Sequence, residues 1–490
     1  MITFLIGIAI LILGGMVYGR VIERVMKPGD AVTPATRLND GVDFVPMKRW
    51  KNSLVELLNI AGTGPILGPI QGALFGPIAF ITIPIGCVIG GAVHDYMCGM
   101  ISLRNDGKQM PGLIKQFLGK HMYHIYQVFV CLMMLLVAVV FIYTPGDIFV
   151  SQILEQKASL DNPVMLIVYG VIFLYYFIAT LFPIDKIIGR IYPVFGAILL
   201  LSAVGVFAGL FIFGYPLPEL WDAGVSLVSP LGDNFFPIFF VTVTCGIVSG
   251  FHSTQATLIS RTVTDEREGR TTFYDMMIVE GFIAMVWAAA AMGALGLDKI
   301  GTGDMSSAPT GVVGIVSKDM LGQIGGVVAI IGVIVLPITS GDTALRSLRL
   351  MIGDALHIDQ KNKKKALLLA TVIFAVAAAV LIYAKVDEQG FSLLWRYFSW
   401  ANETTAVFTF ILAAVYMKKY GMPHLMATLP GAFYLAVVIC FILTARIGFR
   451  LPYMVGIIVS RVAAVLFVIY MIVKKFRREE NVRQTCSNSE

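Results

Sequence analysis

The stretch Asn59-Ile-Ala-Gly-Thr-Gly-Pro-Ile-Leu-Gly-Pro69 interrupts an apolar run, Leu57 to Gly72, that is otherwise suited to cross a membrane. Glycine and proline at this density do not continue an ordinary helix. A second apolar run, Ile238 to Ser260, is interrupted in the same way by Thr244-Cys-Gly-Ile-Val-Ser-Gly-Phe-His-Ser-Thr-Gln255. Hydrocarbon has no water for unpaired backbone groups, so interrupted membrane helices are tolerated only where they line a cavity or are buried in protein. Matched interruptions in two halves of a chain point to the central site of a transporter.

The composition predicts an all-α polytopic membrane protein. Of the 490 residues, 57% are hydrophobic and 14% are charged, and apolar runs of about 20 residues, enough to cross a bilayer core, recur along the chain. The first run is interpreted as a retained span, because Met1 to Ile6 lacks the basic start of a signal peptide. About 13 transmembrane helices are expected, near residues 2–18, 53–72, 76–102, 122–144, 163–182, 192–214, 234–256, 273–296, 326–347, 366–384, 395–417, 425–446 and 453–473.

The charges predict an orientation. If the N-terminus lies outside and the C-terminus in the cytoplasm, most of the 37 Lys and Arg residues fall in cytoplasmic segments, as is typical of membrane proteins. The net charge of +6 therefore indicates topology and contact with the lipid bilayer, and not a nucleic-acid partner. The six cysteines are isolated and mostly within spans, so no disulfide framework is expected. The oligomeric state stays open.

Spans 2 to 6 and spans 7 to 11 form two sets of five, and each set begins with an interrupted span. An odd number of spans per set inverts the second set relative to the first, which predicts the LeuT-type 5+5 inverted repeat. The expected units are an extra span and cytoplasmic loop (1–52), the first repeat (53–214), the second repeat (215–417), and two extra spans with a basic cytoplasmic tail (418–490).

The two interruptions predict a substrate site. The amides at the start of a half-helix attract a carboxylate, and the carbonyls at the end of the preceding one attract a cation. The alternative is that the glycines serve only the close packing of membrane helices. The residues predicted to bind substrate are Asn59, Gly62, Thr63, Gly64, Gly68, Gly246, Ser249, Gly250, His252, Ser253, Gln255 and Glu403.

A second polar set predicts cation coupling. Thr339, Ser340, Asp342 and Thr343 place oxygen ligands within Leu336 to Arg346, and a carboxylate inside a span by default indicates ion or proton handling. The cation is Na⁺ or H⁺, and these residue types are compatible with either one. The alternative is that Asp342 ends a helix and pairs with Arg346.

Further ionisable side chains lie inside other spans. Glu280 is a second coupling candidate, with a structural hydrogen bond as the alternative. His94 and Asp95 are predicted to form a gate. No cofactor and no metal beyond a possible sodium ion are expected. The chain has no GxxxxGK[ST], GxSxG or HExxH motif, so it is not expected to be an enzyme.

Several strings resemble the carbon starvation protein A (CstA) family. They are Asp40-Gly-Val-Asp-Phe-Val-Pro46, Ile60 to Pro69, Gly90-Gly-Ala-Val-His-Asp-Tyr96 leading into Ser102 to Gly107, and Cys245-Gly-Ile-Val-Ser-Gly-Phe-His-Ser253. The resemblance implies a bacterial inner-membrane transporter of the amino acid, polyamine and organocation superfamily, in a family linked to uptake of peptides and, in some members, pyruvate when carbon is scarce. The chain resembles a shorter branch, which has Val55-Glu56 and Asn402-Glu403 where longer members have paired histidines and Asn-Gln.

These observations predict a secondary active transporter that imports a small carboxylate-bearing nutrient, a peptide or an amino acid, by cation symport during carbon starvation. One alternative is a pyruvate/proton symporter. Another is a nutrient sensor that uses the same pocket without net transport.

Overall fold

A computed structural model describes residues 1–41, 43–181, 185–224, 227–296, 309–358, 362–387 and 389–476. In these ranges the chain is almost entirely helical, with one isolated β-bridge between Val228 and Asn234. Ten of the described helices are long and apolar enough to cross a membrane. The prediction of a polytopic helical membrane protein is therefore confirmed, whereas the count of 13 spans, the unit boundaries and the inverted repeat stay predictions.

The first broken helix consists of α4 (Arg49–Ile60) and α5 (Gly64–Gly72). Only residues 61–63 lie between the two helices, so the prediction that Asn59 to Pro69 is non-helical was too long. Pro65 lies in the first turn of α5, where its missing amide proton costs no hydrogen bond. Since unpaired backbone groups are costly at membrane depth, the helix resumes as soon as this sequence allows.

The second broken helix consists of α13 (Phe235–Ile247) and α14 (Gly250–Ile259). Val248 and Ser249 between them have extended backbone angles, with φ of −156° and −137°. The predicted interruption, Thr244 to Gln255, was again too long, because Gly246 lies within α13 and His252 lies in the first turn of α14. Ser253 and Gln255 are likewise helical.

The two broken helices lie side by side. α5 packs against α13, α4 packs against α14, and α15 (Asp275–Leu295) contacts both α4 and α5. A Cβ atom on Gly64 would lie 2.4 Å from the Cβ atom of Cys245, and one on Gly68 would lie 2.9 Å from the carbonyl oxygen of Thr242. Such contacts need glycine, because any side chain would separate the helices. The two broken helices therefore lie against each other in the fold.

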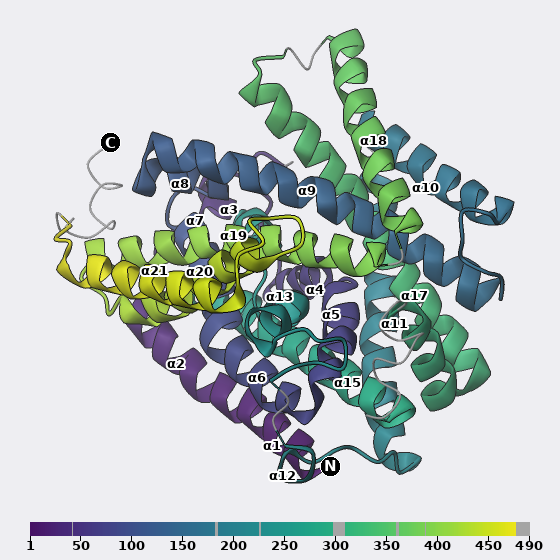
Figure 1. The fold of residues 1–490 in the computed structure, drawn as a ribbon. Helices are drawn as coiled ribbons and strands as arrows, with labels where there is room; N and C mark the ends of the chain where they lie inside the picture. The colour runs from purple at the N-terminus through teal and green to yellow at the C-terminus, as the bar shows by residue number, and fades with distance from the viewer. Residues whose placement is uncertain are drawn as a thin grey trace.

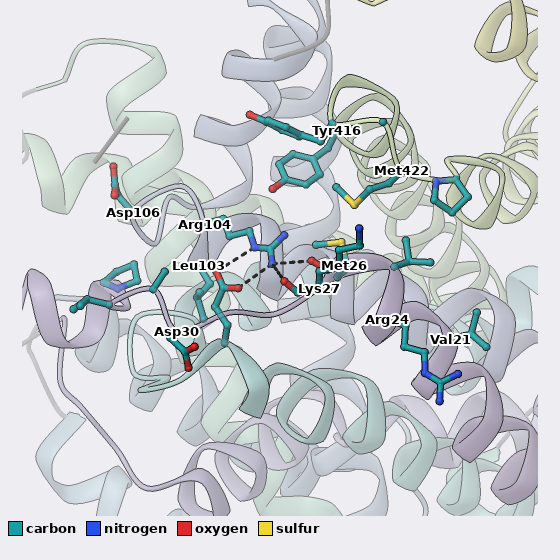
Figure 2. Close-up of a pocket in the computed structure, with 18 of the residues that line it drawn as sticks. Val21, Arg24, Met26, Lys27, Asp30, Leu103, Arg104, Asp106, Tyr416 and Met422 are labelled. Atoms are coloured by element: carbon teal, nitrogen blue, oxygen red, sulfur yellow. Dashed lines mark hydrogen bonds and ion pairs between the residues drawn. The ribbon is translucent and has the colours of Figure 1, made fainter. Parts of the chain in front are cut away.

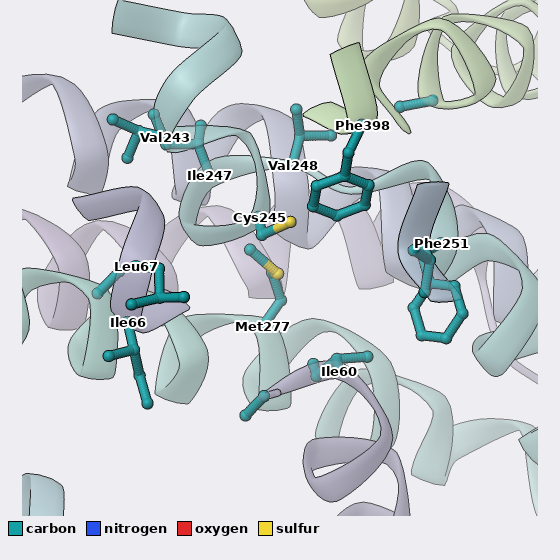
Figure 3. Packing of buried hydrophobic residues seen from close by; sticks show 14 of the residues in the cluster. Ile60, Ile66, Leu67, Val243, Cys245, Ile247, Val248, Phe251, Met277 and Phe398 are labelled. Carbon is teal, nitrogen blue, oxygen red and sulfur yellow. The ribbon is translucent and has the colours of Figure 1, made fainter. Parts of the chain in front are cut away.

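Apolar side chains surround this meeting point. Ile66 and Leu67 of α5, Cys245 of α13 and Met277 of α15 belong to one hydrophobic cluster, and Phe398 of α19 (Gly390–Lys419) joins them (Figure 3). The walls around the breaks are therefore largely apolar, and the polar groups that face the breaks are few.

The other helices enclose this centre (Figure 1). α20 and α21 lie on one side of the broken helices in that view, and α10 and α18 lie on the other. The remaining helices are α1 (Ile2–Ala9), η1 (Ile10–Gly14), α2 (Gly15–Met26), α3 (Pro34–Arg37), η2 (Ala73–Ile78), α6 (Ala79–Gly86), η3 (Cys87–Gly91), α7 (Ala92–Leu103), α8 (Met110–Leu118), α9 (Lys120–Ile148), η4 (Phe149–Ile153), α10 (Pro163–Leu181), α11 (Asp185–Ile212), α12 (Leu220–Ala223), η5 (Glu266–Glu268), η6 (Arg270–Tyr274), α17 (Pro309–Ala355), α18 (Lys363–Val386), α20 (Leu425–Thr444) and α21 (Tyr453–Val473).

Candidate functional site

The first break exposes the start of α5 to the centre of the bundle. The carbonyl oxygen of Thr63 accepts the amides of Ile66 and Leu67 at 3.2 and 2.9 Å, whereas the amides that begin a helix have no acceptor within it. The Thr63 hydroxyl is buried and has no hydrogen-bond partner among the described residues. At Gly62 the nearest atom to an added Cβ would be on the Phe141 ring, at 3.8 Å. The first break therefore carries a buried hydroxyl without a partner among the described residues beside the start of α5.

The second break is held by Asn402 of α19. Its amide oxygen accepts the Phe251 amide at 2.8 Å and lies 3.2 Å from the Ser249 hydroxyl, while its amide nitrogen donates to that hydroxyl at 3.0 Å. The same nitrogen lies 3.4 Å from the Cys245 sulfur. Asn402 thus bridges the end of α13 and the start of α14, and it fixes the extended segment between them.

Asn402 was not among the predicted site residues. The sequence shows an asparagine one position before Glu403, and only the packing of α19 against α13 and α14 assigns it to the break. Polar side chains within an otherwise apolar span were the available signal.

Glu403 is fully buried on the same helix, and neither of its carboxylate oxygens has a hydrogen-bond partner among the described residues. It lies near Thr244, but the Thr244 hydroxyl lies 2.7 Å from the Val241 carbonyl, which accepts its single proton. Cys245 and Tyr434 are also within electrostatic range of Glu403. A buried carboxyl group beside the last turn of α13 is therefore available to a ligand or a proton.

The predicted gate residues lie against the second broken helix. The Asp95 carboxylate contacts the Nδ1 atom of His94 at 2.7 Å and the Nδ1 atom of His252 at 3.0 Å. The Nε2 atom of His252 lies 3.5 Å from the Glu280 carboxylate. The structure therefore brings His94, Asp95, His252 and Glu280 together. The predictions from the sequence had given them three separate roles, namely gate, substrate binding and coupling.

Other predicted substrate residues already have partners or pack closely. The Ser253 hydroxyl donates to the Gly250 carbonyl at 2.6 Å, and Gln255 donates to the Thr254 hydroxyl at 3.0 Å. A Cβ on Gly246 would lie 2.8 Å from the Cβ of Ala284. Asn59 is partly buried in the last turn of α4. The geometry at Gly64, Gly68, Gly246 and Gly250 is that of close helix packing, which was the alternative interpretation of these glycines.

The predicted coupling set lies on α17. Asp342 is buried and accepts the Tyr175 hydroxyl at 3.0 Å and the Thr343 hydroxyl at 2.9 Å. Thr343 is exposed and Ser340 is partly buried, while the side chain of Thr339 lies outside the described residues. Arg346 donates to the carbonyl of Ala179 at 2.9 Å. α17 also contacts α5, so this set lies on a helix adjoining the first broken helix.

A pocket of about 1310 Å³ opens where α2, α7 and α19 end (Figure 2). Arg104 donates to Glu266 at 3.1 and 2.8 Å and to the Met26 carbonyl at 2.9 Å. This pocket was not predicted. Arg37 also pairs with Asp106 in this pocket. Leu103 on its wall is eight residues beyond Asp95 on the same helix, about 12 Å at the rise of an α-helix.

In the described part of the chain, no group of three or more His, Cys, Asp or Glu side chains has a geometry that could hold a metal ion. The five described cysteines are free thiols.

Comparison with known proteins identifies the family. The family model described as "Carbon starvation protein CstA" matches residues 1–206, 146–318 and 300–441. The chain belongs to the carbon starvation protein CstA family. The resemblance to this family that the sequence shows is thus confirmed.

Relatives of this CstA-family chain differ in length and in what their names state. A Haemophilus influenzae relative, an uncharacterized membrane protein, is 40% identical over 337 residues, which cover 60% of this chain and 91% of that protein. The Escherichia coli K12 relative, named peptide transporter CstA, is 24% identical and is matched over 79% of this chain and 72% of its own length. A Helicobacter pylori protein of the same name is 26% identical, over 54% of this chain and 46% of its own length.

Solved structures support the fold alone. The manganese transporter of Eremococcus coleocola, in complex with an aromatic bis-isothiourea substituted compound, aligns with a TM-score of 0.55 and 12% identity, covering 89% of this chain and 97% of that one. A second structure of that transporter, carrying a point mutation, aligns with a TM-score of 0.52 and 11% identity, covering 87% of this chain and 95% of that one. The chain is therefore a membrane transporter by its family, and the solved structures show the fold alone. The Escherichia coli and Helicobacter pylori relatives are named as transporters and not as enzymes, as the sequence predicted.

Proposed function

We propose that the protein is a secondary active importer of a small carboxylate-bearing solute, a peptide or an amino acid, across the bacterial inner membrane. The observation that carries this proposal is the meeting of two broken helices at buried, unpaired polar groups. The start of α5 offers the Gly64 amide and the unpaired Thr63 hydroxyl to a carboxylate, and the second break lies beside it, held by Asn402. The role in carbon starvation is proposed from the family to which the chain belongs.

The chemistry of Glu403 favours a substrate that also carries an ammonium group. Its carboxylate is buried beside α13 without a hydrogen-bond partner among the described residues, and an unpaired buried charge is costly. An ammonium group would supply the missing partner, as in an amino acid or a peptide. Pyruvate has no such group and needs only the amides. The names of the Escherichia coli and Helicobacter pylori relatives, peptide transporter CstA, support the same choice.

The proposed transport cycle uses the inverted repeat expected from the sequence. The broken helices, together with α6, α7 and α15, would rock against the surrounding helices, so that the breaks face each side of the membrane in turn. A cation would drive accumulation, and Asp342 with its hydroxyl partners remains a proposed contact for it.

Proteoliposomes test the proposal. We expect the purified protein to accumulate a labelled dipeptide when a cation gradient is imposed, with separate sodium and proton gradients identifying the cation. Accumulation of labelled pyruvate and not dipeptide would favour the pyruvate alternative. Substrate binding without uptake under any gradient would favour a nutrient sensor.

Glu403→Gln tests ammonium recognition. Gln has nearly the same volume but no charge, and a hydrogen bond to a charged group contributes about 1.5–3 kcal/mol. We therefore expect the KM for a labelled dipeptide to rise roughly 10- to 100-fold, measured by uptake into proteoliposomes.

The matched control is Glu155→Gln, since Glu155 is exposed at the surface. This variant should leave the KM unchanged. A Glu403→Gln protein with a normal KM for the dipeptide would show that Glu403 does not meet the ammonium group.

A further inference from the structure

Five ionisable side chains lie together on one side of the two breaks. They are Glu56 of α4, His94 and Asp95 of α7, His252 of α14 and Glu280 of α15, called here the buried acid–imidazole cluster. Each is at most 1% exposed. α4 and α7 each contact both α14 and α15, so the cluster is built from segments that are far apart in the sequence.

His252 connects two of the acids. Its Nδ1 atom lies 3.0 Å from Asp95 and its Nε2 atom lies 3.5 Å from Glu280. Because an imidazole can take up a proton on one nitrogen and release one from the other, this row is a path for a proton between two carboxylates. His94 holds the other Asp95 oxygen at 2.7 Å.

Two members of the cluster have no hydrogen-bond partner. Both oxygens of Glu56 and both oxygens of Glu280 are buried and unpartnered among the described residues. Glu56 is nevertheless close enough to Asp95 and Glu280 to interact electrostatically with each. Glu56 therefore lies near other acidic groups, and the described basic group nearest to Glu280 is the His252 ring, 3.5 Å away.

The cluster cannot hold three negative charges. In the described part of the chain, the ion pairs of Asp95 and Glu280 are with histidines, and no lysine or arginine pairs with Glu56, Asp95 or Glu280. Removing a charge from water without a partner costs several kcal/mol, and like charges at this depth add to that cost. Protons are the smallest cations that restore neutrality. Among the described residues, these side chains do not form a group that could hold a metal ion.

We propose that the buried acid–imidazole cluster is the proton-binding site of this transporter, with Glu56, Glu280 and His252 sharing the proton that enters. The chemical class of the ligand is H⁺, and the coupling part of the proposal rests on the proposed function. Other titratable groups face the cluster from neighbouring elements. They are the thiols of Cys87, Cys98 and Cys245.

The cluster is placed to couple proton binding to the breaks. Glu56 lies on the last turns of α4 before the first break, and His252 lies in the first turn of α14 after the second break. Negative charge in the cluster pushes the acidic side chains of α4, α7 and α15 apart, and a bound proton removes that repulsion. Loading the cluster therefore changes the spacing of the two half-helices that bound the site.

Infrared difference spectroscopy tests the proton site without any transport assay. The purified protein in lipid, titrated from acidic to alkaline pH, should lose a carboxylic-acid C=O band that shifts when the protein carries ¹³C-labelled glutamate. Glu56→Gln and Glu280→Gln, studied singly, should each remove part of that band, while Glu155→Gln leaves it intact. A wild-type protein without such a band, or folded cluster variants with an unchanged band, would overturn the proposal.

Proteoliposomes then test coupling separately. With the dipeptide and an internal pH-sensitive dye, Glu280→Gln should lower proton-driven accumulation at least tenfold while exchange of labelled for unlabelled dipeptide, which needs no gradient, continues. Asp342→Asn is the comparison. If Asp342→Asn alone abolished proton-driven accumulation and Glu280→Gln behaved as wild type, the cluster would not be the coupling site. A titrating band without dipeptide transport would support the proton site and contradict the proposed substrate.

Discussion

Gly250→Ala is expected to abolish folded, transport-competent protein. A Cβ atom at this position would lie 1.9 Å from the Thr405 hydroxyl oxygen, 2.3 Å from the Asn402 carbonyl oxygen and 2.6 Å from the Ala406 amide nitrogen. Two of these atoms are backbone of α19 and cannot rotate away, so α14 must leave α19 or the helix must deform. Overpacking of this kind costs about 3 kcal/mol or more. Thermal unfolding and fluorescence-detected size exclusion in detergent measure the loss.

Gly170→Ala is the matched control, because no atom lies within 4 Å of an added Cβ at that position of α10. It should keep or slightly raise the melting temperature, since alanine favours a helix more than glycine does. If Gly250→Ala were as stable as Gly170→Ala, α14 and α19 would not be in the close contact described above.

Asn402→Ala is expected to disorder the second break. It removes the acceptor of the Phe251 amide, the amide contact to Ser249 and the bridge to Cys245. Each buried donor left without an acceptor costs about 1–3 kcal/mol, and here that cost falls on a two-residue connection between helices. We expect dipeptide uptake to fall roughly 10-fold or more, equivalent to about 1.4 kcal/mol in binding.

Thr404→Ala provides the control on the same helix. Among the described residues, the Thr404 hydroxyl donates to the Trp400 carbonyl of its own helix and to no other helix, so its removal should change uptake less than twofold. Asn402→Asp keeps an acceptor for the Phe251 amide, so its dipeptide uptake should lie between that of Asn402→Ala and that of Thr404→Ala. Normal uptake by a folded Asn402→Ala protein would mean that the second break does not depend on this side chain.

The positions of the breaks could be predicted from local chemistry, whereas their lengths could not. Gly62, Gly64, Pro65 and Gly250 mark where a helix stops or starts, which is a property of these residues alone. How much backbone stays unwound depends on hydrogen bonding at membrane depth, and the helices resume sooner than the glycine-rich stretches suggested.

The buried polar contacts could not be predicted from the sequence, for a different reason. Glu56 and Glu280 are 224 positions apart, and Asp95 and His252 are 157 apart. The sequence shows that each ionisable side chain costs free energy within a membrane span. It does not show that four helices bring these side chains together. Asn402 was missed in the same way, since its partners lie on α13 and α14.

The most direct test is an experimental map of the protein in a lipid nanodisc with a bound dipeptide, determined by electron cryomicroscopy. We predict density for the dipeptide against residues 61–63 and 248–249, with its carboxylate at the Gly64 amide, where α5 starts, and its ammonium group facing Glu403. Continuous helices through both segments, or a dipeptide bound elsewhere, would contradict the account.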